Sequence, residues 1–132
     1  MKRYTPLLLL MLAAACQTTP ADIAGFNAYL WKQDKAGCGR ERSQMVDTLM
    51  VQRDKLLQLN ENELISLLGN PDARELWERN QKFLIYLLEP NARCQAPEDA
   101  PVTAKALHIR LSAIGRANEV FIGSFKAGRD QP

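Results

Sequence analysis

The first sixteen residues determine how much of this chain is available to fold, because they have the pattern of a removable secretion signal. Lys2 and Arg3 form a short basic start, an apolar run extends from Leu7 to Leu12, and three alanines stand directly before Cys16. The run is shorter than the ~20 residues that a permanent membrane-spanning helix needs. We therefore expect residues 1–15 to be cleaved off as a signal peptide, which leaves about 117 residues, enough for one domain.

The cysteine at the end of this segment predicts a lipid anchor. Small residues followed by a cysteine are typical of bacterial lipoproteins, although Ala13 stands where leucine is usual. Two other interpretations remain: Cys16 is a core or disulfide cysteine, or cleavage occurs nearby and releases a soluble protein. Acyl chains contribute about 0.8 kcal/mol per buried methylene, so a multiply acylated Cys16 would hold the protein on a membrane. Gln17 after Cys16 resembles the outer-membrane sorting pattern of enteric bacteria, which predicts an outer-membrane anchor facing the periplasm.

The charge of the chain argues against nucleic acid as a partner. The 17 basic and 15 acidic residues give a net charge of +2, and Lys2 and Arg3 account for all of it. The mature protein is therefore close to neutral, and its basic residues alternate with acidic ones. A nucleic-acid-binding domain needs a basic face that contacts several phosphates.

The cysteine count supports the same location. With Cys16 acylated, Cys38 and Cys94 are the remaining pair in an oxidising compartment, where disulfides persist. A disulfide that closes a loop of about 57 residues stabilises a domain by on the order of 4 kcal/mol. The alternatives are two buried, reduced thiols and a redox pair. The chain has no C-x-x-C spacing that would favour redox chemistry and no cluster of His and Cys that would favour a zinc site.

Helical periodicity dominates the first half of the domain. Residues 16–22 form a polar tether, residues 21–33 are either a short helix or an extended arm, and residues 40–58 keep one apolar stripe. The next helix has defined ends, since Asn60 and Glu63 form a capping box and Gly69 precedes Pro71. We expect two helices, over residues 40–58 and 60–68.

The second half has the pattern of strands. We expect residues 72–81 to be a charged connection, residues 82–89 a strand covered on both faces, and residues 91–102 a long loop. Residues 105–112 alternate strictly, which predicts a half-exposed strand, and residues 119–125 predict a third strand. The expected fold is an α+β two-layer sandwich, in which the two helices pack on a three-stranded antiparallel meander within residues 23–126. Residues 127–132 are expected to be a disordered tail.

One stretch resembles a known family. Leu67-Leu68-Gly69-Asn70-Pro71-Asp72 resembles the central signature of the SmpA/OmlA (BamE-like) outer-membrane lipoproteins, in which the second helix ends in Leu-Gly-x-Pro. The strand with Tyr86 and the strand pair around Gly115 match the family's order of elements, so the likeness covers residues 45–125. The chain departs from the family at Gln58 and Leu59, where Gly-Met is usual, it has no match to the Tyr-Arg-Pro entry segment, and it carries the extra cysteine pair.

The resemblance implies a small accessory binding module of the machinery that folds β-barrels into the outer membrane. Members of that family act without catalysis. For this chain we expect no cofactor, no evident small-molecule substrate, and as partners the membrane, through acylated Cys16, and an envelope protein. Fold likeness alone does not carry function.

The candidate chemistry of the chain is sparse. His108 is the single histidine and lies on the polar side of its expected strand, and no nucleophile elbow, phosphate loop or zinc motif is present. We therefore expect no enzyme and no metal site, and we take His108, Arg110 and the loop around Cys94 as candidate partner contacts. The alternatives are a periplasmic inhibitor or ligand-binding protein, and a small hydrolase that uses His108.

Overall fold

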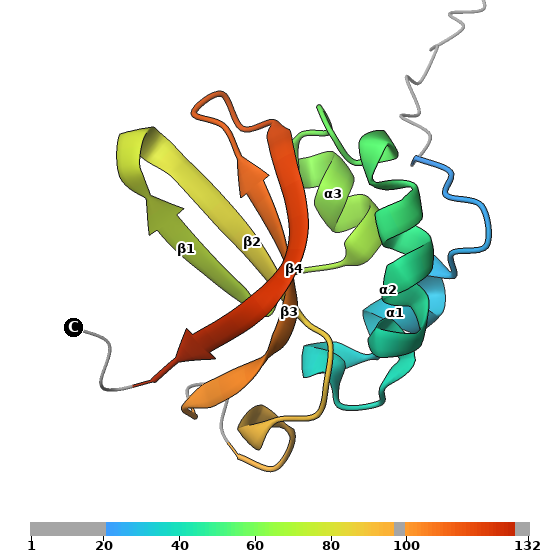
Figure 1. The fold of residues 1–132 in the computed structure, drawn as a ribbon, viewed down its shortest axis with the longest axis vertical. Helices are drawn as coiled ribbons and strands as arrows, with labels where there is room; N and C mark the ends of the chain where they lie inside the picture. Colours follow the sequence, from blue (N-terminus) through green and yellow to red (C-terminus); the bar gives the residue numbers. More distant parts are fainter. Residues whose placement is uncertain (1–20, 97–99, 129–132) are drawn as a thin grey trace, which may run out of the picture.

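The chain is described here from a computed structural model that covers residues 21–96 and 100–128. The expected signal peptide, Cys16, most of the expected tether and the end of the expected tail lie outside the described residues. The described part has a helical layer beside a strongly twisted antiparallel sheet, with the helices first in the chain (Figure 1). The predicted α+β class is therefore confirmed. The predicted numbers of helices and strands, two and three, were too low, since the described residues form three α-helices and four strands.

The helical layer contains α1 (Ala28–Gln33), α2 (Glu41–Val51) and α3 (Glu61–Leu68). Short 3-10 turns follow the first two helices: η1 (Lys35–Gly37) and η2 (Arg53–Lys55). The longest of these helices has 11 residues, about half of what a membrane crossing requires, and none of the described helices is apolar and long enough to make one.

The segment before α1 combines both interpretations that the sequence left open. Asn27 caps α1 by accepting a hydrogen bond from the Leu30 N–H, so the helix begins only at Ala28. The preceding residues form an arm that packs on the domain through the buried Ile23 and through Phe26, whose ring lies 5.5 Å from that of Trp31.

The predicted helix over residues 40–58 is too long, because α2 ends at Val51. Gln52 already leaves the helix, and its side-chain amide pairs with both backbone groups of Ala24, which attaches the N-terminal arm. Gln58 then takes a positive φ of 72°, a conformation that no regular helix contains. The tertiary contact to the arm therefore outweighs the apolar stripe that continues past Gln52.

The α3 prediction is confirmed in detail. The Asn60 side chain accepts from the Glu63 N–H, and the Glu63 carboxylate accepts from the Asn60 N–H, which completes the capping box. The helix ends at Gly69, whose φ of 78° suits glycine.

The sheet has the order β1-β2-β3-β4 and all its pairings are antiparallel. Its strands are β1 (Ala73–Trp77), β2 (Gln81–Leu87), β3 (Val102–Leu111) and β4 (Ala117–Ala127). Two further 3-10 turns lie beside β2, η3 (Glu78–Asn80) before it and η4 (Ala92–Cys94) after it.

The connection expected over residues 72–81 was wrong, because this segment forms β1 and the turn into β2. Its charged residues fit an edge strand, where one side of the backbone and many side chains remain in solvent. Arg79 and Asn80 take positive φ values of 58° and 59° and reverse the chain, so the hairpin turn uses no glycine. This absence of a glycine signal explains why the sequence pattern did not show the turn.

The half-exposed strand expected over residues 105–112 was also wrong. Leu107, Ile109 and Leu111 pack against the helices, while Ala104 and Ala106 are buried on the opposite face. The side chains of this strand do alternate between the two faces of the sheet, but the face that carries the small alanines is buried as well. The last strand continues to Ala127, which pairs with Val102, so the first residue of the expected tail belongs to the sheet.

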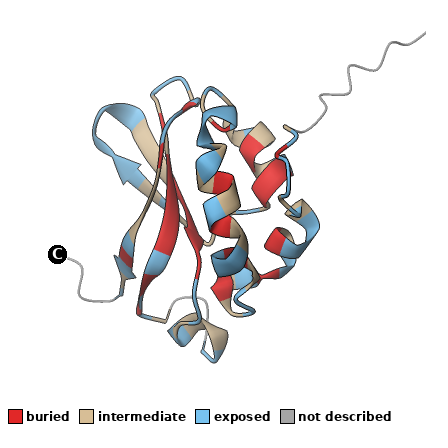
Figure 2. Ribbon diagram, turned by 45° about the vertical axis from the view of Figure 1, so that its right-hand side comes forward, coloured by how far each residue is buried: buried red, intermediate tan, exposed pale blue. Residues whose placement is uncertain are grey.

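The core consequently has two parts, one on each face of the sheet. Figure 2 shows the buried residues along the central strands and on the sides of the helices that face them. The larger part lies between helices and sheet, and the smaller part lies on the face turned away from the three α-helices. The smaller part comprises Ile85, Leu87, Val102, Ala104, Ala106 and Phe125.

Candidate functional site

Four aromatic rings gather on the sheet face turned away from the helices. We call this group the aromatic patch; it consists of Trp77, Phe83, His108 and Phe121. The His108 and Phe121 rings stack at 4.8 Å with an interplanar angle of 6°. Phe83 meets both rings edge-on, at 6.4 Å and 6.2 Å, and Trp77 meets Phe83 edge-on at 6.1 Å. These are the geometries that aromatic pairs prefer.

The register of the sheet brings these rings together. His108 pairs directly with Phe121, and its neighbour across the other strand is Ile85. Gly123 lies beside the stack on the same face, where a Cβ would be in ordinary van der Waals contact with the Phe121 ring at 3.4 Å and with His108 Nε2 at 3.6 Å. The patch is partly open to solvent, because Trp77 is 59% exposed and Phe83 and Phe121 are half-buried.

His108 is buried, with only 8% of its surface exposed, in contrast to the solvent-facing position that the sequence pattern indicated. Burial lowers its pKa from the usual 6.5, while the Gly123 backbone and the charge of Glu75 oppose that shift. The imidazole is therefore biased toward its neutral form. Its place in a ring stack makes it part of the patch rather than an exposed acid or base.

Arg110 lies two residues further along the same face and is half-buried. Its guanidinium pairs with Glu119 at 2.9 Å, and the two side chains are 34% and 46% exposed. Since solvent screens such a pair, it contributes little to stability. The structure thus places both sequence-predicted contact residues on one face, and Arg110 forms a charged border beside Phe83.

The other patch residues were missed from the sequence. Trp77 lies in the charged stretch that predicts a connection, and Phe83 and Phe121 lie in stretches that predict strands without marking either as a contact residue. The pairing of Phe83 with Arg110 and of His108 with Phe121 relates residues far apart in the chain. The period-2 pattern of each strand predicts which of its residues share a face, but it does not predict the register that sets these residues opposite one another on neighbouring strands.

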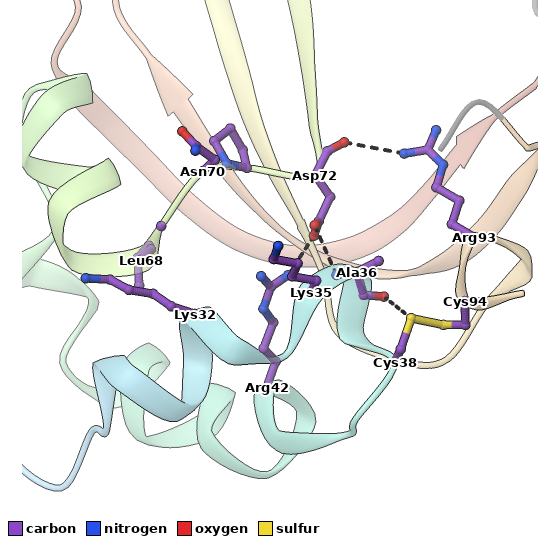
Figure 3. Close-up of a pocket in the computed structure, with 12 residues that line it drawn as sticks. Lys32, Lys35, Ala36, Cys38, Arg42, Leu68, Asn70, Asp72, Arg93 and Cys94 are labelled. Atoms are coloured by element: carbon purple, nitrogen blue, oxygen red, sulfur yellow. Dashed lines mark hydrogen bonds and ion pairs between the residues drawn. A yellow bond between two sulfur atoms is a disulfide. The ribbon is translucent and has the colours of Figure 1, made fainter. Parts of the chain in front are cut away.

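A second region lies where the helical layer meets the start of β1 and the end of β2. Arg42 is 2% exposed and donates from Nη1 to Asp72 Oδ2 at 2.6 Å and to the Leu87 carbonyl at 3.2 Å (Figure 3). Its guanidinium also lies over the rings of Trp31 and Tyr86, at 5.4 Å and 5.7 Å. This buried cation therefore joins α2 to the sheet.

Tyr86 belongs to the same region. Burial raises the pKa of its hydroxyl far above the usual range, so the group stays protonated and donates to the Gly69 carbonyl at 2.9 Å. The tyrosine thus fixes the end of α3 against β2. It acts as a structural hydrogen-bond donor.

A pocket of about 640 Å³ opens beside the Arg42–Asp72 pair, and we call it the basic pocket. Figure 3 shows its side chains, which come from the α1–α2 segment, the α3–β1 connection and η4. The lining residues are Lys32, Lys35, Ala36, Cys38, Arg42, Leu68, Gly69, Asn70, Pro71, Asp72, Arg93 and Cys94. No sequence motif indicates this pocket, because its basic residues lie in separate segments that only the fold brings together.

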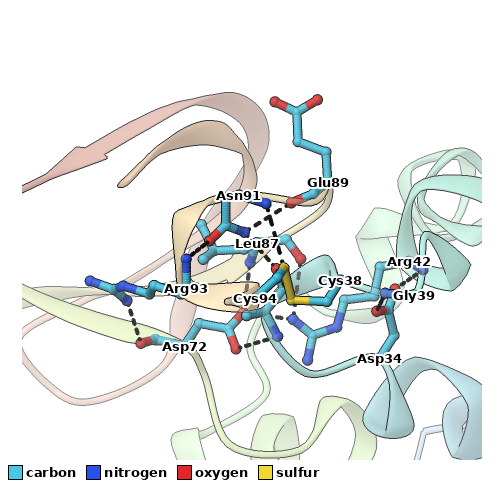
Figure 4. Close-up of a disulfide and its surroundings, with 11 residues drawn as sticks. Asp34, Cys38, Gly39, Arg42, Asp72, Leu87, Glu89, Asn91, Arg93 and Cys94 are labelled. Carbon is cyan, nitrogen blue, oxygen red and sulfur yellow. Dashed lines mark hydrogen bonds and ion pairs between the residues drawn. A yellow bond between two sulfur atoms is a disulfide. The ribbon is translucent and has the colours of Figure 1, made fainter. Parts of the chain in front are cut away.

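The predicted disulfide between Cys38 and Cys94 is present and forms one wall of this pocket (Figure 4). It joins the residue after η1 to the last residue of η4. Asn91 reinforces the junction, because its side-chain amide donates to the Ala36 carbonyl at 2.8 Å and its oxygen accepts from the Arg93 N–H. The loop after β2 is therefore attached to the helical layer.

Gly37 makes the same junction possible. A Cβ at Gly37 would lie 2.6 Å from the Glu89 backbone nitrogen, and the residue has a positive φ of 70°. Main chain therefore packs directly on main chain here, beside the disulfide.

Acidic residues elsewhere on the domain serve structure. Glu61 accepts hydrogen bonds from Lys82 at 2.6 Å and Arg74 at 3.3 Å, and the bond from Lys82 is the main reason why the pKa of Glu61 is lowered. These pairs connect α3 to β1 and β2. Within residues 21–96 and 100–128, no group of three or more His, Cys, Asp or Glu residues is placed to hold a metal ion.

Comparison of the chain with known protein families, with characterised proteins and with solved structures found no match, so the resemblance to the SmpA/OmlA family stays a prediction.

Proposed function

We propose that this chain is a lipid-anchored protein of the bacterial envelope that binds another envelope protein and carries out no catalysis. The N-terminal pattern ending at Cys16 supports the anchor, with the domain facing the periplasm from the outer membrane. A role accessory to outer-membrane assembly or integrity follows from the family resemblance.

The aromatic patch is the observation that carries the binding function. Trp77 is largely exposed, yet its ring is held edge-on against Phe83, so little conformational entropy is lost when a partner covers it. Aromatic residues that are partly buried in this way are typical anchors at the centre of protein interfaces. The patch therefore offers a preformed contact area to a protein partner.

Charged residues border the patch, as they do at many interfaces. Arg110 and Glu119 lie at one side, and Glu75 lies on β1, directly opposite Phe83 and two residues before Trp77. This arrangement suits a partner that presents an apolar side chain with polar groups around it. Arg110 keeps the role of a contact residue, while His108 supports the patch from beneath.

The binding site is tested by photo-crosslinking in cells that make the full chain. A photoreactive amino acid at position 77 should form a covalent adduct with one envelope protein, and the same amino acid at position 51 should not. Val51 is the matched control, because it is 86% exposed on α2, in the helical layer. The proposed surface is wrong if position 51 captures the same protein or position 77 captures none.

Substitution then measures the contribution of the patch. Trp77→Ala should reduce co-purification of the captured protein by about tenfold or more, whereas Val51→Ala should leave it unchanged. Mass spectrometry of the mature N-terminus tests the anchor separately. An unmodified Cys16 contradicts the lipid anchor without affecting the patch.

A further inference from the structure

We propose that the basic pocket binds a small polyanion, a ligand with two or more negative charges such as a phosphate ester or a polycarboxylate. The proposal rests on the charge, the hydrogen-bonding capacity and the construction of the pocket. It does not depend on the aromatic patch or on the lipid anchor.

The pocket has an excess of positive charge. Four basic side chains line it, and Asp72 is the single acidic side chain among its lining residues; the four are Lys32, Lys35, Arg42 and Arg93. Arg42 and Asp72 neutralise each other through their ion pair. The other three form no ion pair with any residue in the described part of the chain. Three cationic side chains without an ion pair thus line one pocket, and an anion that enters it lowers their mutual repulsion.

Asp72 is engaged by the fold, and its charge is paired with that of Arg42. Its Oδ1 accepts from the Ala36 N–H at 3.1 Å, and its Oδ2 accepts from Arg42 at 2.6 Å and from the Leu87 N–H at 2.7 Å. The nearby Asp34, buried behind Arg42, is used in the same way, since it accepts from the backbone N–H groups of Gly39 and Arg42. Both carboxylates therefore hold the fold, and neither forms an ion pair with Lys32, Lys35 or Arg93.

The basic side chains still have donors to offer. Lys32 donates to the Ser66 carbonyl, which uses one of its three N–H groups. Arg93 reaches the carbonyls of Asp72 and Ala100 only at 3.4 Å each. Lys35 is exposed and makes no hydrogen bond through its side chain within the described residues. Several charged donors thus remain available to the oxygen atoms of a ligand.

The pocket is a built cavity, since three separate chain segments frame it and a covalent bond ties two of them together. The Cys38–Cys94 disulfide holds the segment of Lys35 beside that of Arg93, and the Gly37 contact with the Glu89 backbone fixes the turn after Lys35. Its volume of about 640 Å³ falls within the range of small-molecule sites. The apolar Leu68, Ala36 and Pro71 contribute to the walls and strengthen the electrostatic attraction by displacing water.

Calorimetric titration of the full chain in nonionic detergent tests the proposal, with pyrophosphate and citrate as separate probes at low ionic strength. We expect saturable binding to one site that weakens as sodium chloride is added. Lys35→Gln should weaken binding about tenfold, and Lys32→Gln should do the same. Arg53→Gln is the control, because Arg53 is an exposed basic residue on η2, outside the pocket.

The two probes assign the ligand class. Binding of pyrophosphate alone supports a phosphate ester, binding of citrate alone supports a polycarboxylate, and binding of both supports recognition by charge. The proposal is overturned if neither probe binds below about 10 mM, or if the Lys35 and Lys32 variants bind as tightly as Arg53→Gln. Circular dichroism confirms that each variant is folded, and Trp77→Ala should bind both probes unchanged, which separates this site from the patch.

Discussion

His108 shows how a single polar side chain is accommodated within a ring cluster. Its imidazole stacks on Phe121 and meets the edge of Phe83, so it contributes to the patch mainly through its flat ring. Burial favours the neutral form, which lowers its pKa. Since the folded protein binds the imidazole proton less readily than the unfolded chain does, protonation of His108 favours unfolding.

The stability of the protein should therefore depend on His108 at mildly acidic pH. The stabilising effect of the neutral ring is complete above the ordinary pKa of 6.5 and declines as the pH falls below it. In thermal denaturation between about pH 7.5 and about pH 5.5, the wild-type midpoint should fall more steeply than that of His108→Gln. Parallel midpoints for the two proteins would contradict this assignment.

Glu61 provides the control for that experiment. Lys82 lowers the pKa of this carboxyl below its ordinary 4.5, so its contribution is present above pH 4.5 and is lost only as the pH falls through the lowered value. Glu61→Gln should therefore keep the wild-type slope between about pH 7.5 and about pH 5.5. The two groups act in different pH ranges.

At the scale of elements, α3 is short and depends on its ends. It has eight residues, too few to be stable as an isolated helix, so capping and packing must supply its stability. The Asn60 and Glu63 side chains satisfy backbone N–H groups at its start, while Leu64, Leu67 and Leu68 are buried against the sheet. Its first turn also carries Glu61, which pairs with Lys82.

Asn60→Ala should lower the free energy of unfolding by about 1 kcal/mol, because the Glu63 N–H loses its partner. Asn62→Ala is the matched control, since Asn62 is exposed within the same helix and alanine favours helix there. Urea denaturation of both variants measures the difference. A loss in Asn62→Ala as large as that in Asn60→Ala would show that the cap is not responsible.

The elements differ in how far the sequence alone predicts them. Helix α3 was predictable because its start and stop signals are local, and β2 because its apolar run is continuous. The edge strand β1 was not predictable, since its charged residues and the turn formed by Arg79 and Asn80 have the sequence pattern of a loop. The end of α2 depended on Gln52 and its contact with Ala24, 28 residues away, which local periodicity does not report.

At the scale of the whole molecule, one corner joins the two layers. The disulfide, the Arg42–Asp72 pair and the Gly37 contact all connect the α1–α2 segment to the region around β2. The disulfide was predictable by counting, because the expected acylation of Cys16 would leave one pair of cysteines. The pocket beside it was not, because its basic residues are far apart in the chain and none belongs to a recognisable motif.

Removal of the disulfide should weaken the whole domain. The Cys38→Ser/Cys94→Ser double variant should lose about 4 kcal/mol in its free energy of unfolding, because the unfolded chain regains the freedom of a loop of 56 residues or so. Urea denaturation measures the loss, and dithiothreitol should destabilise the wild type while leaving the double variant unchanged. Equal stability of wild type and double variant would rule out a stabilising crosslink.

The order of the strands has a consequence for the synthesis of this protein. Each strand pairs with the one that follows it in the chain, so the sheet assembles from short-range hairpins. The three α-helices are made first, however, and their apolar sides are covered only when β2 and β3 follow. The disulfide of Cys38 likewise forms only after Cys94 has been made, 56 residues later in the chain. The N-terminal half of the domain therefore has no cover for its apolar surface until the strands that follow it are available, and its folding is completed from the C-terminal side.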